Sequence, residues 1–219
     1  MTIFDILGPV MVGPSSSHTA GAVKIGLVAS RLLGDIPQVA EIYFHGSFAA
    51  TGEGHGTDRA IVAGLLGMEP DNMDIPRSFE IAKEKNMEFE ISNIFIKDAH
   101  PNTVLLELFG EGDKKLKIQA ASIGGGRIMI RKLDDIDVNF TGENPTLIVH
   151  NQDEPGHVAK VTSALAEKGV NIATMQLYRD KRGGYAVMVI ETDQPIPKDF
   201  IEMLSCLDGV IKVTCIEAV

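Results

Sequence analysis

The chain has 219 residues, of which 44% are hydrophobic and 23% charged, and 30 acidic against 20 basic residues give a formal net charge of -10. This composition is typical of a globular protein and excludes a disordered, collagen-like or coiled-coil chain. The acidic balance opposes binding to phosphate backbones and anionic membranes, so we expect no nucleic-acid partner and no membrane partner. The N-terminus lacks a basic segment before an apolar run, and no apolar run approaches the roughly 20 residues of a membrane span, so we expect a soluble, cytoplasmic protein.

Hydrophobic periodicity in the first 140 residues predicts helices and strands in alternation. Helices are expected over 17–33 and 57–66, where apolar residues recur with the helical period and Gly34 and Gly67 follow as stop signals. The glycine-rich stretch between these helices, residues 46–56, is expected to be a loop. Strands are expected at residues 40–44, 87–95, 103–109, 116–121 and 128–130. The pattern predicts an α+β domain.

A second domain is expected after an acidic, turn-rich stretch at residues 134–145, and we place the domains at 1–141 and 142–219. The expected order there is a ferredoxin-like βαββαβ arrangement, with strands at 147–150, 171–178, 185–191 and 211–215 and helices at 156–168 and from 197. The helices have apolar stripes that we expect to be buried, formed by Val158, Val161, Leu165, Phe200, Met203, Leu204 and Leu207. The two cysteines, Cys206 and Cys215, are expected to be small core residues without a disulfide.

The first of four chemistry-bearing motifs is the loop at residues 13–19, which opens the first helix. Free backbone N–H groups and the positive end of the helix dipole favour an anion such as a carboxylate or phosphate. Hydroxyl donors add to this character, and His18 titrates near neutral pH. The hydroxyls belong to Ser15, Ser16, Ser17 and Thr19. The alternative is a simple N-cap, for which one serine is enough.

The second motif, residues 51–58, places His55 between two glycines directly before a predicted helix. The glycines leave this imidazole uncrowded, and Thr57 or Asp58 can cap the helix. The alternative is a surface turn. The third motif is His100-Pro101-Asn102, where proline stiffens the chain between two polar side chains.

The fourth motif is the glycine run at residues 122–126, where a strand should continue. It indicates either a close approach of the backbone to another group or a β-bulge. Together with His18, His55 and His100 of the other motifs, the glycine run forms a plausible set of groups for acid-base chemistry and carboxylate binding. No metal-ligand spacing, G-x-S-x-G elbow, P-loop or Rossmann fingerprint occurs, so we predict no metal site in this chain.

In the second domain, Asn151 and Asp153 lie between the first strand and the first helix, and Asn171 begins the next strand. We expect these ends to meet and to hold the amino and carboxyl groups of a small amino acid. The alternative is an Asp cap followed by a structural Pro-Gly turn.

The four motifs together resemble the β chain of bacterial iron-sulfur L-serine dehydratase. They read GPSSSHTAG at 13–21, TGEGHGTD at 51–58, HPN at 100–102 and SIGGG at 122–126. The resemblance covers the whole chain. The first domain is similar to the allosteric substrate-binding domain of some phosphoglycerate dehydrogenases. The second resembles an ACT domain, through DEPG at 153–156 and GVNI at 169–172.

The resemblance implies the conversion of L-serine to pyruvate and ammonia with a [4Fe-4S] cluster. Two cysteines cannot supply the three or four thiolates of such a cluster, so its ligands are expected on a separate α subunit and this chain is expected to be inactive alone. His55 is the leading candidate for proton transfer and His18 its rival. The groups expected to bind or orient substrate are Ser15, Ser16, Ser17, Thr19, Thr57, Asp58, His100 and Asn102.

For the ACT-like domain, the resemblance implies regulation or dimerisation. We expect it to bind serine or another amino acid at Asn151, Asp153 and Asn171, across a pair of such domains. Two other functions stay open. One is a non-catalytic amino-acid sensor that regulates another enzyme. The other is a self-contained Ser-His hydrolase, which lacks an identifiable base-orienting acid.

Overall fold

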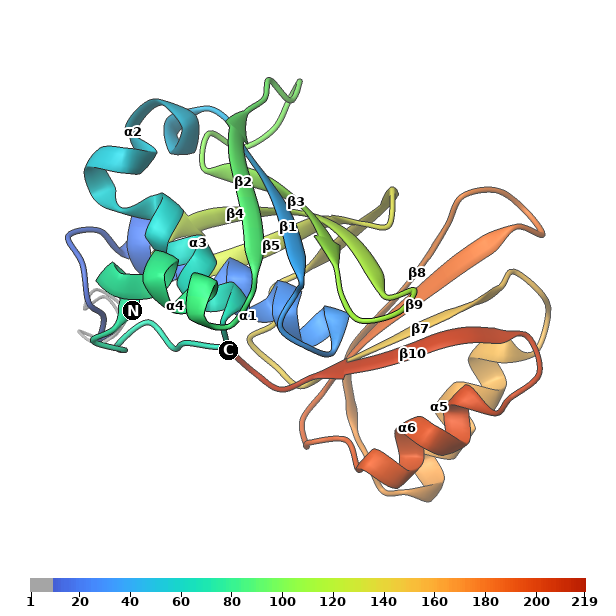
Figure 1. Ribbon diagram of the computed structural model, residues 1–219. Helices are drawn as coiled ribbons and strands as arrows, with labels where there is room; N and C mark the ends of the chain where they lie inside the picture. Colours follow the sequence, from blue (N-terminus) through green and yellow to red (C-terminus); the bar gives the residue numbers. More distant parts are fainter. Residues whose placement is uncertain (1–9) are drawn as a thin grey trace. The chain divides into compact units, whose positions relative to one another are not determined.

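A computed structural model describes residues 10–219 of the chain (Figure 1). The chain divides into two compact units after Asp135. Each unit has its own sheet and its own helices. Within the described residues, no helix is both long and apolar enough to cross a membrane.

The first unit opens with a π-helical turn, η2 (Ser16–Ala20), which continues directly into α1 (Gly21–Leu33). The side chain of Ser15 caps this helix by accepting a hydrogen bond from the backbone N–H of His18. Gly34 ends it in the left-handed conformation that glycine adopts without strain. The predicted helix over 17–33 is confirmed, with one more residue at its start.

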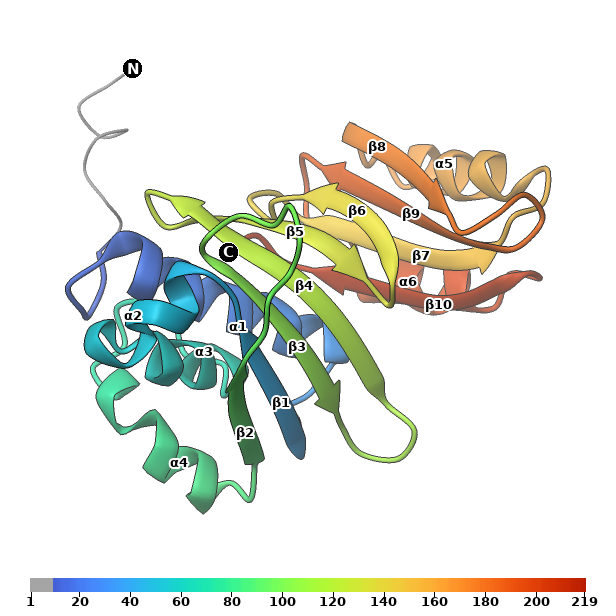
Figure 2. The same cartoon turned by 90° about the horizontal axis from the view of Figure 1, so that it is seen from above.

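The other elements of this unit form one mixed sheet and a layer of helices (Figure 2). They are β1 (Val39–Phe44), α2 (Ser47–His55), α3 (Thr57–Leu65), η3 (Ile75–Arg77), α4 (Ser78–Glu84), β2 (Glu88–Asn93), β3 (Thr103–Phe109), β4 (Lys115–Gly124) and β5 (Arg127–Leu133). The strand order of the sheet is β2-β1-β3-β4-β5-β6, and β1 is parallel to β2. The edge strand β6 (Ile136–Phe140) comes directly after the division point at Asp135. Alternate residues of β1 are buried, as expected for a strand with one face on the core.

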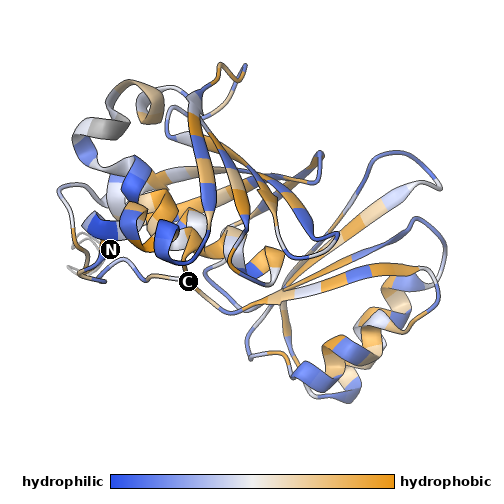
Figure 3. Ribbon diagram, in the orientation of Figure 1, coloured by the Kyte–Doolittle hydropathy of each residue, from blue (hydrophilic) through white to orange (hydrophobic). Residues whose placement is uncertain are grey.

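Two glycines let α1 and α3 approach each other more closely than side chains allow. A Cβ atom on Gly64 would lie 2.0 Å from the carbonyl oxygen of Val23, and one on Gly26 would lie 2.3 Å from that of Ile61. Apolar residues dominate α1 and the strands of the first sheet, and the hairpin turns are hydrophilic (Figure 3). The close crossing fixes the separation of the two helices, at whose N-terminal ends His18 and Thr57 lie.

Three expectations for the first unit are wrong. Residues 47–55 form α2 rather than a loop, because Phe48 is fully buried and the backbone N–H of Ser47 donates to the carbonyl of Pro101. Gly56, rather than Thr57 or Asp58, is the N-cap residue of α3, and no side chain caps that helix. The stretch at residues 134–145, expected to be turn-rich, contains the strand β6, and the charged stretch at residues 78–84, where no element was expected, forms α4.

The glycine run at residues 124–126 joins β4 to β5 in a tight turn, and all three glycines have positive φ. The pairing register shifts between Ser122 and Gly124, which agrees with the bulge alternative. Nothing lies within 4 Å of a Cβ placed on Gly124 or Gly125. The expected close approach is therefore absent at those two positions.

The second unit contains the predicted βαββαβ sequence of elements. They are β7 (Thr146–Gln152), α5 (His157–Glu167), β8 (Ile172–Arg179), β9 (Tyr185–Thr192), α6 (Lys198–Ser205) and β10 (Val210–Ile216). The sheet order is β10-β7-β9-β8, and each neighbouring pair is antiparallel. Both helices lie on one face of this sheet (Figures 1 and 2). Their core includes Val161, Leu165, Phe200 and Leu204.

Some residues of the predicted stripes lie outside this core. Val158, in the first turn of α5, and Met203, next to the buried Leu204 in α6, are exposed. Cys206 is also exposed, since it follows α6 as its C-cap, while Cys215 is partly buried. Both cysteines are free, so the expected absence of a disulfide holds and the expected burial of Cys206 is wrong.

Candidate active site

His18 lies between hydroxyl groups from two other helices. Its Nδ1 atom is 3.2 Å from Oγ1 of Thr57 at the start of α3, and its Nε2 atom is 3.4 Å from Oγ of Ser47 at the start of α2. The ring of Phe48 packs edge-on against the imidazole, with 5.2 Å between centroids. Burial, and to a smaller extent the nearby His55, lower the pKa of His18. This histidine is therefore held neutral and in one orientation.

His55 lies beside His18 at the end of α2, with 5.1 Å between the ring centroids. It is exposed and lines two cavities, one of about 690 Å³ and one of about 270 Å³. Asp58 lines the larger cavity and Thr19 the smaller one. The Oγ1 atom of Thr19 is buried and has no hydrogen-bond partner within the described chain. A ligand in the smaller cavity would therefore meet an exposed imidazole, and the unpartnered Thr19 hydroxyl is buried in the wall of this cavity.

The third and fourth motifs lie against the first two. The carbonyl of Pro101 accepts a hydrogen bond of 2.7 Å from the backbone N–H of Ser47, and the carbonyl of Asn102 accepts one of 3.0 Å from that of Ser122. The Ser122 side chain in turn packs on the start of α1, because a Cβ on Gly21 would lie 2.1 Å from its Oγ. That Oγ is buried and unpartnered among the described residues. Four motifs from distant parts of the chain thus meet in one region.

Not every predicted side chain is free for a ligand. The Ser15 hydroxyl is engaged as the helix cap, while Ser16 and Ser17 are half-buried in the turn that follows. The Oδ1 atom of Asp58 accepts a hydrogen bond from the backbone N–H of the next residue. His100 is exposed, and its Nδ1 accepts a hydrogen bond from the backbone N–H of Asn102 within its own loop.

Ser47 is the residue of this region that the sequence analysis missed. Its hydroxyl faces His18 and its backbone joins α2 to the 100–102 loop. It lies 29 positions from His18 in the chain. The only signal in the sequence was its place directly after Gly46, whose φ of 60° makes the turn from β1 into α2.

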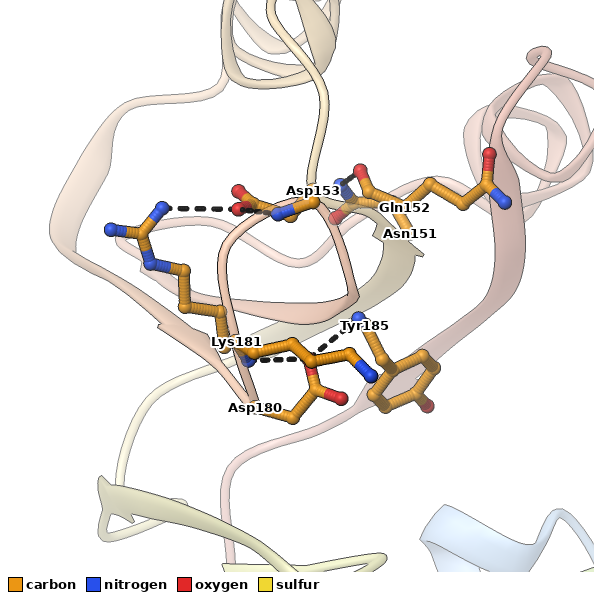
Figure 4. A network of polar contacts seen from close by, with 8 residues as sticks. Asn151, Gln152, Asp153, Asp180, Lys181 and Tyr185 are labelled. Carbon is orange, nitrogen blue, oxygen red and sulfur yellow. Dashed lines mark hydrogen bonds and ion pairs between the residues drawn. The ribbon is translucent and has the colours of Figure 1, made fainter.

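In the second unit, Asn151 and Asp153 lie at the end of β7 (Figure 4). The Asp153 carboxylate accepts hydrogen bonds from the backbone N–H of Gly183 at 2.9 Å and from Arg179 at 3.0 Å. These contacts hold the pKa of Asp153 below its ordinary value. The Oδ1 atom of Asn151 is buried without a partner among residues 10–219. The 152–156 loop is therefore fixed by the β8–β9 hairpin beside an unsatisfied amide oxygen.

Asn171 lies at the opposite end of the sheet, so the expectation that it meets Asn151 within one domain is wrong. Across β9, Asn151 pairs with Ala186, whereas Ile172 pairs with Thr192. Six residues of strand separate these positions, or about 20 Å at about 3.3 Å per residue. The Asn171 side chain donates a hydrogen bond to Asp193.

Within residues 10–219, no group of three or more His, Cys, Asp or Glu side chains is placed to hold a metal ion. Cys206 and Cys215 both belong to the second unit. Burial raises the pKa of the Cys215 thiol to about 11, which disfavours the thiolate that binds iron. The residues present do not fit an iron-sulfur cluster held by this chain.

Comparisons with known proteins agree with this division of the chain into two kinds of domain. Residues 2–133 match the serine dehydratase beta chain family, and residues 145–204 match the ACT domain family. A Bacillus subtilis protein named "Probable L-serine dehydratase, beta chain" is 40% identical over 97% of this chain and 96% of its own length. The "L-serine dehydratase, beta chain" of Peptoniphilus asaccharolyticus is 36% identical over 96% of this chain and 94% of its own length.

A further relative is similar along most of this chain but is named for a different reaction. The D-3-phosphoglycerate dehydrogenase of Archaeoglobus fulgidus is 28% identical over 90% of this chain, which corresponds to 37% of that protein. The similarity agrees with the mixed α+β architecture and with the ACT-type second unit. From the family match over most of the first unit and from two relatives that align along nearly the whole chain, we conclude that the chain belongs to the serine dehydratase beta chain family and carries a C-terminal ACT domain.

Proposed function

We propose that this chain is the β subunit of an L-serine ammonia-lyase and completes an active site shared with a separate α subunit. The observation that carries the proposal is the meeting of four motifs around two histidines, in a family whose relatives are named L-serine dehydratase beta chains. In the proposed reaction, L-serine loses its α-proton and its hydroxyl as water to give an aminoacrylate, which is hydrolysed to pyruvate and ammonia.

The residues of this chain bind the substrate and move its protons. His55 is our candidate for proton transfer, because it is exposed and lines both cavities. The buried, unpartnered hydroxyl of Thr19, the half-buried Ser16 and Ser17, and the helix N-terminus in which these residues lie suit a carboxylate. A group of this kind can position the substrate while a neutral imidazole accepts its proton.

The expected [4Fe-4S] cluster belongs to the partner in this proposal. When bound, such a cluster supplies an iron that acts as a Lewis acid on the leaving hydroxyl. This chain has only two cysteines, neither near the histidine region in sequence, so the cluster ligands are assigned to the α subunit and the chain alone is expected to be inactive.

The second unit, proposed as an ACT domain over residues 142–219, is assigned regulation or self-association. The unsatisfied Oδ1 of Asn151 and the fixed loop at Asp153 support an amino-acid site at one end of the sheet. Since Asn171 lies at the other end, we propose that one ligand contacts both ends only across two copies of the domain. Such a site requires self-association.

A second candidate function is an amino-acid sensor that acts on another enzyme. It is favoured by the Archaeoglobus fulgidus relative, in which these two domains form part of a protein named for a different reaction. A sensor needs donors for a carboxylate but has no use for a proton-accepting imidazole.

The test combines an anaerobic pull-down with one substitution. The wild-type chain is isolated with its partner from its own cells and assayed for iron, sulfide and pyruvate formed from L-serine. His55→Ala is expected to abolish pyruvate formation and to leave co-purification of the partner unchanged, while Glu84→Gln, on the exposed end of α4, serves as a surface control. Normal turnover by the His55 variant would refute its role. A colourless chain that binds L-serine without a cysteine-rich partner would favour the sensor.

A further inference from the structure

The contacts of His18 determine which of its two nitrogens carries the hydrogen. Nδ1 is within hydrogen-bond distance of Thr57 Oγ1, at 3.2 Å, whereas the distance from Nε2 to Ser47 Oγ is 3.4 Å. The first distance is at the upper limit of ordinary hydrogen bonds, and the second lies beyond it. Thr57 is therefore the closer of the two hydroxyls that face the ring.

Thr57 is fully buried, and its hydroxyl has to donate to something. Among the described residues, the only hydrogen-bond partner of its Oγ1 atom is Nδ1 of His18. If Nδ1 carried the hydrogen, the threonine hydroxyl would point its own hydrogen at no acceptor, which is unfavourable in a buried place. If the hydroxyl donates instead, its hydrogen has an acceptor in Nδ1, and Nε2 carries the ring hydrogen.

We infer that Thr57 is a positioning residue that holds His18 in the Nε2–H form, so that His18 donates a hydrogen bond to an oxygen of the substrate and His55 is the histidine that accepts the proton. The substrate part of this inference rests on the proposed function. The assignment of the ring hydrogen to Nε2 is independent of the proposed function.

The position of Nε2 agrees with a donor role. It faces Ser47, whose backbone N–H donates to Pro101, and so it points to the place where the start of α2 meets the third motif. Because its contact with Ser47 is long, the N–H can form a shorter bond with a carboxylate or a leaving oxygen. His55, in contrast, makes no side-chain hydrogen bond within residues 10–219 and is exposed to the cavities, so a lone pair of its imidazole is accessible.

The hydrogen position is measured by nitrogen NMR of the ring atoms of His18 in the full chain. We expect Nδ1 to have the shift of an unprotonated nitrogen that accepts a hydrogen bond. In Thr57→Val, which keeps the shape and removes the hydroxyl, the Nδ1 shift is expected to move to that of a free nitrogen, and Thr57→Ser is expected to restore it. Ser47→Ala is the matched control, because it removes the hydroxyl at the other nitrogen and should leave the Nδ1 shift unchanged.

Protonation of Nδ1 in the wild-type chain would overturn the inference, even if the valine variant fails to fold. An unchanged Nδ1 shift in a folded Thr57→Val chain would overturn it as well.

In the complex with the partner, kcat for L-serine is expected to fall by about tenfold in Thr57→Val, which is less than the roughly 10²- to 10⁴-fold effect of a general acid or base, because Thr57 acts through His18. Thr57→Ser should recover most of it. If the wild-type complex forms no pyruvate, the proposed function fails while the NMR result still decides the hydrogen position. If the complex is active and Thr57→Val has the wild-type kcat, the role of His18 fails while the proposed function stands.

Discussion

The close crossing of α1 and α3 is open to a direct test by adding one methyl group. In Gly64→Ala, the new Cβ would lie 2.0 Å from the carbonyl oxygen of Val23 and 2.7 Å from the backbone nitrogen of Leu27. Both atoms belong to the backbone of α1, so no side-chain rotation relieves the contact. The two helices would have to move apart by about 1 Å or more to reach ordinary van der Waals distance.

The expected change is a balance of two opposing effects. Replacing glycine by alanine in a helix interior stabilises by about 1 kcal/mol on propensity alone. Over-packing costs about 1 to 3 kcal/mol, and a clash between two backbones belongs at the upper end of that range. We therefore expect a net loss of about 2 kcal/mol in the free energy of unfolding, or about 1 M in the urea midpoint for an m value of about 2 kcal/mol/M.

The assay is urea unfolding followed through amide NMR signals of α1, which report the first unit separately. Gly54→Ala is the matched control, since nothing lies within 4 Å of a Cβ at that position in α2. The urea midpoint of Gly54→Ala should equal or exceed that of the wild-type chain. Separation of the helices should also lengthen the contact between His18 and Thr57, so the Nδ1 shift of His18 should move in Gly64→Ala. A midpoint at or above that of the wild-type chain would refute the packing argument.

Two predictions concern the second unit. Burial, with a smaller effect of Lys212, lowers the pKa of His150 from its ordinary 6.5 to about 4. The unfolded chain therefore binds a proton that the folded chain does not, and stability should fall by about 3 kcal/mol as the pH drops from about 6.5 to about 4. Urea midpoints between pH 7 and 4.5 measure this slope, and an equal slope in His150→Gln would contradict the assignment. Calorimetric titration of the full chain with L-serine should give heat that Asn151→Ala abolishes, and no heat in the wild-type chain would count against an effector site.

Strand and helix patterns in this sequence were informative wherever one face is buried. The strand β3 begins and ends where the pattern predicts, because alternate side chains along it face the core. The pattern failed at α2, where Gly52 and Gly54 lower the helix propensity. Burial of Phe48 and the hydrogen bond between Ser47 and Pro101 are tertiary effects, and no local signal predicts them.

The site was predictable as a set of residues but not as a geometry. Spacing along the chain pointed to His18 and His55, and the structure places them side by side. The sequence did not reveal that Ser47 faces one nitrogen of His18 and Thr57 the other, since both contacts depend on how three helices pack. In the second unit the sequence predicted a contact that does not form, because the strand register separates Asn151 from Asn171.

The glycine crossing and the chemistry of the site are connected through the helix ends. Because α1 and α3 touch through Gly26 and Gly64, the helix starts that carry His18 and Thr57 lie next to each other. The N-terminus of a helix carries partial positive charge, which opposes an added proton on a nearby imidazole and favours a carboxylate. In the proposed function, one packing contact thus serves two needs of an elimination that starts from an amino acid: a helix N-terminus that favours the carboxylate, and a buried His18 whose pKa is lowered.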